Sequence, residues 1–166
     1  MIIRKTLRQI YKLIIISYLL LWISIKLVTN KKKFIIVSDQ YGRLGNRLYL
    51  FAQLIAFAKK ENFELFLPGF FDYIKYFEHF EYLASYGNNY TGIPNFIPQE
   101  LLFYCFNSLT KIFSLIPFDK IQVFSFFKES DGNPRIKIMQ SEAKCIFFNG
   151  FIFLDYMLDF DSTKNE

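Results

Sequence analysis

Residues 34–60 constrain the fold more than any other stretch of the chain, and they read FIIVSDQYGRLGNRLYLFAQLIAFAKK. Residues 34–38 form an apolar run that ends in serine, without the alternation of a half-exposed strand, which is typical of a strand covered on both faces in a parallel sheet. A glycine turn follows. From about Asn46 to Lys60 the sequence predicts a helix that is apolar on most of its circumference, with Asn62 as its stop. This order of strand, turn and helix indicates an α/β domain.

The residues that follow extend the same pattern. A second strand is expected over Phe63–Leu67, ended by Pro68 and Gly69, and strand, helix and strand at this spacing predict a parallel βαβ unit with a right-handed crossover. Further elements are expected in chain order: an aromatic-rich helix over 70–86, a loop over 87–98, an amphipathic helix over 101–118, strands over 121–127, 136–139 and 145–148, and a short aromatic segment to residue 160.

Residues 10–28 are almost entirely apolar, with Lys12 and Lys26 near the two ends. As a helix these residues would extend about 28 Å, close to the thickness of a bilayer core. The stretch therefore predicts a single N-terminal membrane anchor. A helix lying in the membrane interface is the alternative, because the uninterrupted apolar core runs only from Leu13 to Ile25. Basic residues flank both ends equally, so the sequence does not indicate on which side of the membrane the domain lies.

The distribution of charge argues against a nucleic-acid partner. The whole chain has a formal net charge of +5, but residues 1–33 carry eight Lys and Arg and no acidic residue. The remaining residues hold 12 basic and 15 acidic side chains. A nucleic-acid-binding domain needs its positive charge on the folded surface, whereas basic residues beside an apolar stretch fit lipid headgroups.

Few residues in the chain could serve metal or nucleophilic chemistry. Two cysteines, Cys105 and Cys145, and one histidine, His79, exclude a zinc cluster, and we expect no metal cofactor. Buried free thiols are favoured over a disulfide. His79 has no partner at a spacing that indicates catalysis, and Asn89 begins the one glycosylation sequon, which is used only in a secretory lumen.

The glycine turn holds the candidate binding residues, which are Gly42, Arg43, Gly45, Asn46 and Arg47. Unpaired N–H groups at the start of a helix favour an anion, and arginine donors match phosphate oxygens, so a diphosphate is a chemically sensible ligand. The alternative is a tight turn whose glycines allow positive φ, with Asn46 as the helix N-cap. The pattern satisfies neither the dinucleotide-binding nor the P-loop motif.

The run GRLGNRLYLFAQLIAFAKKENFELFLPGF resembles the N-terminal signature of the fucosyltransferases, both the α-1,2-fucosyltransferase family and the protein O-fucosyltransferases. A weaker resemblance lies at IFFNGFIFLDYML, near the C-terminal end of the chain. The resemblance covers about residues 34–160. It implies the N-terminal Rossmann-like domain of a glycosyltransferase-B fold, with GDP-fucose as substrate, a glycan acceptor and no metal.

By this resemblance the five loop residues would bind the donor nucleotide sugar, with Arg43 and Asn46 at the diphosphate or fucose and the two glycines allowing close approach of the backbone. Arg47 departs from the family, which usually has Gln there. The family also carries an H-x-R-x-D motif in its C-terminal domain, whose arginine stabilises charge on the departing diphosphate. This motif is absent from the sequence. The catalytic residues therefore stay unknown, and we expect the chain to be inactive unless a C-terminal domain or a second chain completes it.

The expected organisation is a basic segment over 1–9, a membrane anchor helix over 10–28, a basic linker over 29–33, a Rossmann-like α/β domain over 34–160 and a frayed tail over 161–166. The expected function is a membrane-tethered, fucosyltransferase-like glycosyltransferase. Two alternatives remain open: a non-catalytic membrane-associated α/β domain derived from such an enzyme, and another kind of nucleotide-binding α/β protein.

Overall fold

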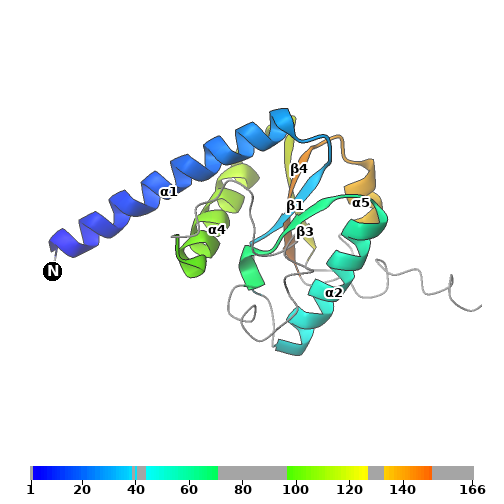
Figure 1. Cartoon of the computed structure of the whole chain (residues 1–166), viewed down its shortest axis with the longest axis horizontal. Coiled ribbons are helices and arrows are strands. Elements are labelled where there is room, and N and C mark those ends of the chain that lie inside the picture. Colours follow the sequence, from blue (N-terminus) through cyan, green and yellow to red (C-terminus); the bar gives the residue numbers. More distant parts are fainter. Residues whose placement is uncertain (1, 39, 41–43, 71–96, 127–132, 151–166) are drawn as a thin grey trace, which may run out of the picture.

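A four-stranded, all-parallel sheet organises the protein (Figure 1). The computed structural model describes residues 2–38, 40, 44–70, 97–126 and 133–150. The strands lie in the order β2-β1-β4-β3. Their bounds are β1 Phe34–Val37, β2 Glu64–Phe66, β3 Ile121–Phe126 and β4 Cys145–Gly150. The expected α/β class is confirmed, and so is the parallel pairing of the first two strands.

Helices cover both faces of the sheet, and the strands divide their side chains between them. On β1, Ile35 and Val37 pack with α2 (Leu44–Lys60) and α5 (Pro134–Gln140). Phe34 and Ile36 point to the other face and pack with α1 (Ile2–Thr29) and α4 (Gln99–Leu115). Both faces of the central strands are therefore buried, which is why their sequences are apolar without alternation.

The end of α2 shows why the helix stops where the sequence predicts. Asn62 has a φ of 57°. The Phe63 N–H donates to the Ala58 carbonyl at 2.8 Å, the Asn62 N–H donates to the Lys59 carbonyl at 3.4 Å, and the Phe63 ring meets Phe57 edge to face. These features make a Schellman cap with its hydrophobic contact. This cap leads the chain directly into β2. A 3₁₀ turn, Pro68–Phe70, follows the strand.

The strand expected over 136–139 is wrong, because these residues belong to helix α5. Asn133 caps this helix by accepting a hydrogen bond from the Ile136 N–H at 3.3 Å. Pro134 occupies the first helical position, where its missing N–H costs nothing. Ile138 is buried, while Ile136 and Met139 are exposed. In a strand Ile136 and Ile138 would lie on the same face, so this burial pattern fits a helix and not a strand.

Other boundaries differ by a few residues. Helix α4 begins and ends slightly earlier than the expected 101–118, and β4 continues to Gly150 instead of ending at residue 148. The strands expected over 121–127 and 145–148 are confirmed in type. Several expectations lie outside the described residues: most of the helix over 70–86 and the loop over 87–98, including His79 and Asn89, together with the aromatic segment to residue 160 and the tail over 161–166.

One helix in the described part of the chain, Thr6–Thr29 within α1, is long and apolar enough to cross a membrane. Length and composition of this kind also fit a signal sequence near an N-terminus. The C-terminal half of α1 packs against the sheet and α4, whereas its N-terminal end projects beyond them (Figure 1).

Candidate functional site

The candidate site lies where β1 ends and α2 begins. Ser38 follows the last residue of β1 and is fully buried. Its hydroxyl lies 2.6 Å from the Thr110 hydroxyl of α4. Thr110 uses its own proton to donate to the Phe106 carbonyl at 2.9 Å, so Ser38 is the donor in the pair. This link holds the carboxyl end of β1 against α4, and it removes the Ser38 hydroxyl from contact with a ligand.

Three of the five predicted site residues fall in the first turn of α2, and two lie outside the described residues. Gly45 and Asn46 are exposed and Arg47 is half-buried, whereas Gly42 and Arg43 are not among the described positions. The helix begins at Leu44, so Asn46 lies inside it and is not its N-cap. The structure therefore contradicts a tight turn capped by Asn46. Residues 41–43 of the predicted loop lie outside the described residues.

Gly45 does not need the conformational freedom of glycine to build this fold. It lies in a helix, and Gly150 is the one described glycine with a positive φ. No described atom lies within 4 Å of the place where a Cβ would stand. Glycine in a helix costs up to about 1 kcal/mol relative to alanine. Among the described residues, nothing therefore blocks the close approach of another molecule to the Gly45 backbone.

The electrostatics at the start of α2 favour an anion. The first turn contains no acidic residue, so no carboxylate of that turn offsets the positive end of the helix dipole. Lys59 and Lys60 lie in the last turn, where they complement the negative end. Arg47 adds a guanidinium group near the first turn, and its charge increases the positive potential there.

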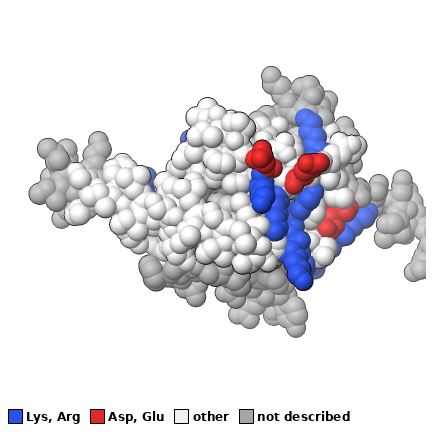
Figure 2. Space-filling model, turned by 90° about the horizontal axis from the view of Figure 1, so that it is seen from above, with Lys and Arg blue, Asp and Glu red and all other residues white. Residues whose placement is uncertain are grey.

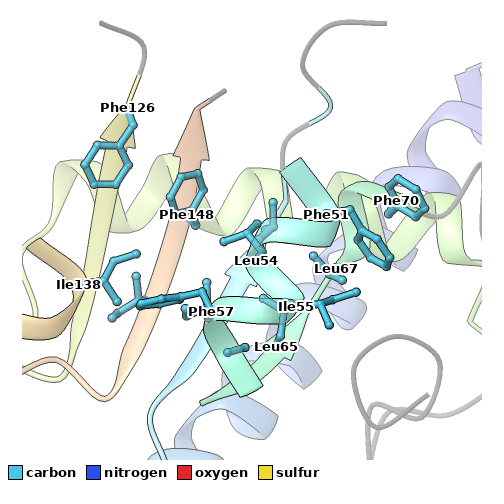
Figure 3. Close-up of a cluster of buried hydrophobic side chains, with 14 of the residues drawn as sticks. Phe51, Leu54, Ile55, Phe57, Leu65, Leu67, Phe70, Phe126, Ile138 and Phe148 are labelled. Atoms are coloured by element: carbon cyan, nitrogen blue, oxygen red, sulfur yellow. The ribbon is translucent and has the colours of Figure 1, made fainter. Parts of the chain in front are cut away.

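Behind this turn the described residues enclose only a small hollow of about 20 Å³. Arg47 is the one charged residue on a lining that is otherwise apolar: Val37, Leu50, Phe51, Leu54, Leu67, Gly69 and Phe70. Phe51 and Phe70 close it with parallel rings 4.3 Å apart, and Figure 3 shows these rings beside Leu54 and Leu67. A hollow of this size holds about one water molecule. A nucleotide would have to lie over the turn and not inside this hollow.

Neither cysteine offers a nucleophile. Cys105 and Cys145 are free and buried, as expected. Burial raises the pKa of the Cys145 thiol well above its ordinary value, and burial also raises the pKa of Cys105, against a smaller opposing effect of Lys12. Both side chains therefore stay protonated at neutral pH. Among the described residues no group of three or more His, Cys, Asp or Glu side chains could hold a metal ion.

The pair of Ser38 and Thr110 was not predicted from the sequence. The one local signal is a serine placed directly after an apolar strand, and nothing in the sequence shows that α4 would supply its partner.

The chain matches no protein-family model, no curated protein and no solved structure in comparisons with known proteins. The resemblance to fucosyltransferases therefore depends on the motif residues alone.

Proposed function

We propose that the chain is the N-terminal domain of a membrane-tethered, fucosyltransferase-like glycosyltransferase, with GDP-fucose as donor and a glycan as acceptor. The observation that carries this proposal is the first turn of α2, where an exposed glycine, an exposed asparagine and an arginine follow the carboxyl end of a parallel strand. Ligands of open α/β sheets bind at this end of the strands. The motif resemblance supplies the identity of the donor.

In this proposal the residues of the first turn bind and orient the diphosphate. Backbone N–H groups at the start of α2 would donate to its oxygens, and Asn46 and Arg47 would add side-chain donors. Gly45 would let the diphosphate approach the backbone closely, because a side chain there would fill the open space. The sugar-transfer step would need a further group to stabilise the departing diphosphate, since the sequence contains no H-x-R-x-D motif to supply the arginine.

The test is calorimetric titration of the full chain, in detergent micelles, with GDP and GDP-fucose. We expect Asn46→Ala and Gly45→Ala to weaken binding of both nucleotides about tenfold, which corresponds to about 1.4 kcal/mol. Lys59→Met at the other end of the same helix is the matched control and should bind as the unaltered chain does. Equal affinity in all variants, or no binding of GDP at millimolar concentration, would contradict the proposal.

A non-catalytic membrane-associated domain is the second candidate, and the small apolar hollow behind the first turn favours it. Such a domain would melt at the same temperature with and without GDP. Preference for ADP or UDP over GDP would instead indicate another class of nucleotide-binding protein.

We further propose that α1 attaches the domain to a membrane. Its length and apolar composition support this attachment, as do the exposed Lys31 and Lys32 that follow it.

A further inference from the structure

Helix α1 has one face that belongs to the protein core. Ile15, Leu19, Trp22 and Ile23 are each at most 5% exposed, and they pack in one cluster with strands β1 and β2 and helix α4. The Trp22 ring meets three phenylalanine rings edge to face, at centroid distances of 6.4, 5.0 and 6.2 Å. These partners are Phe34, Phe66 and Phe106.

Polar contacts hold the C-terminal end of the same helix on the domain. Lys26 forms an ion pair with Glu64 of β2 at 2.9 Å. Lys144 donates a hydrogen bond from Nζ to the carbonyl of Leu27 at 2.8 Å. The helix from Ile15 onward is therefore part of the folded domain and not a tether beside it.

The opposite face of α1 is apolar and solvent-exposed, and we refer to it as the outer strip. Ile14, Leu21 and Val28 are 59%, 58% and 82% exposed, and their spacing of seven residues places them in one line along the helix. Two serines, Ser17 and Ser24, also lie on this side of the helix, and the Ser24 hydroxyl is satisfied by donating to the Leu20 carbonyl at 2.8 Å. The other exposed apolar side chains on or beside this line are Leu7, Ile10, Leu13, Leu20 and Ile25.

The described charged residues of α1 lie away from the outer strip. Lys12 lies over the ring of Tyr104 in α4, 5.7 Å from its centroid, and Lys26 pairs with β2. Arg8 lies one turn before Lys12, on the same side of the helix. On the face that Figure 2 shows, the projecting part of α1 is mostly free of charged side chains, and charged side chains gather near its C-terminal end.

The docked part of α1 cannot span a bilayer while it stays docked. The stretch that is long and apolar enough to cross a membrane, Thr6–Thr29, includes Ile15, Leu19, Trp22 and Ile23, whose side chains are buried in the protein core. A spanning orientation would have to pull Trp22 and its neighbours out of the core cluster and separate Lys26 from Glu64.

We propose that α1 lies in the plane of the membrane surface, with its outer strip in the acyl region and the domain docked on its inner face. The occupant of the strip is a lipid bilayer. Between Ile14 and Val28, about four helical turns, the strip has no charged residue. Lys31 and Lys32 are exposed just beyond its end, where they would meet anionic headgroups. The inference rests on the membrane attachment proposed above and not on the sugar-transfer activity.

The sole tryptophan of the chain makes the orientation measurable. The full chain is reconstituted with vesicles of phosphatidylcholine and phosphatidylglycerol whose acyl chains carry bromine either near the headgroup or near the terminal methyl. We expect neither lipid to quench Trp22, because the ring is buried in protein. Three reporters, Ile14→Trp, Leu21→Trp and Val28→Trp, each combined with Trp22→Phe, should all be quenched, more by the shallow bromines and in the same ratio.

A spanning helix gives a different pattern. Positions 14 and 28 would differ in depth by about 21 Å, so the three ratios would differ, and the deep bromines would quench Trp22 of the unaltered chain. Either result overturns the in-plane orientation. The measurement on unaltered Trp22 stands even where the Trp22→Phe background folds poorly.

A charge substitution separates the orientation from the attachment itself. Leu21→Glu should lower vesicle binding on the order of tenfold, whereas Ile136→Glu, at a similarly exposed position of α5 on the other face of the sheet, should leave it unchanged. Failure of the unaltered chain to sediment with vesicles would overturn the attachment and the orientation together. Lipid-free dimerisation that Leu21→Glu abolishes would show that a second copy of the chain covers the strip, which also overturns the proposal.

Discussion

Gly150 of β4 is paired with Phe126 of β3, and it leaves no room for a side chain. Its φ is 139°, and a Cβ there would stand 2.3 Å from the Phe126 carbonyl oxygen. Gly45 is the contrasting case, since its backbone is helical and no described atom lies near its Cβ position.

We therefore predict that Gly150→Ala lowers the free energy of unfolding by about 1–3 kcal/mol, because the substitution adds backbone strain and a clash with main-chain atoms. Gly45→Ala should leave it unchanged or raise it by up to about 1 kcal/mol, because alanine is the better helix former. Denaturant unfolding of the two variants measures this. Equal changes in the free energy of unfolding for the two variants would contradict the prediction, because they would show that the backbone near Phe126 moves to accommodate the added methyl group at little cost.

The buried Cys145 thiol makes the free energy of unfolding depend on pH in the alkaline range. Burial raises its pKa well above the ordinary 9.0, so the unfolded thiol ionises first and the folded chain holds the extra proton. The free energy of unfolding should therefore fall as pH rises above about 9, by up to about 1.4 kcal/mol per pH unit from this one group. Cys145→Ala should fall less steeply over the same range, and parallel curves would count against the prediction.

At the scale of single elements, α5 depends on its cap. The Asn133 side chain accepts from the Ile136 N–H, and the helix is only seven residues long. We predict that Asn133→Ala lowers the free energy of unfolding by about 1 kcal/mol, whereas Asn133→Asp or Asn133→Ser retains most of the cap. Thermal unfolding followed by circular dichroism distinguishes these variants. If aspartate and serine were as damaging as alanine, the cap would not be the cause.

At the scale of the whole molecule, α1 completes the second face of the sheet. Deleting residues 1–29 removes four buried apolar side chains, each worth about 1.5–3 kcal/mol, which together approach the stability of an ordinary domain. We predict that residues 30–166 lose cooperative thermal unfolding. Deleting only residues 1–9, which precede the docked stretch, is the control and should keep it. An unchanged melting temperature without α1 would show that the helix is dispensable to the fold.

Local patterns carried most of the element predictions. The apolar run at β1, the apolar helix α2 and the Asn62 stop were all predictable, because each depends on neighbours within a few residues. Helix α5 was missed because its few apolar residues were interpreted without the Asn-Pro start signal at 133–134. The candidate site was predicted only as a loop. Its link from Ser38 to Thr110 joins residues 72 positions apart, which no local pattern reports.

The sequence by itself determined that this is an α/β protein with an apolar N-terminal helix and an apolar helix directly after its first strand. Tertiary structure decided the strand order β2-β1-β4-β3, because pairing β4 between β1 and β3 depends on contacts between distant segments. It also decided what α1 does. Apolar side chains look alike in sequence whether protein or lipid covers them, and only the packing shows that Trp22 faces the core while Leu21 faces outward.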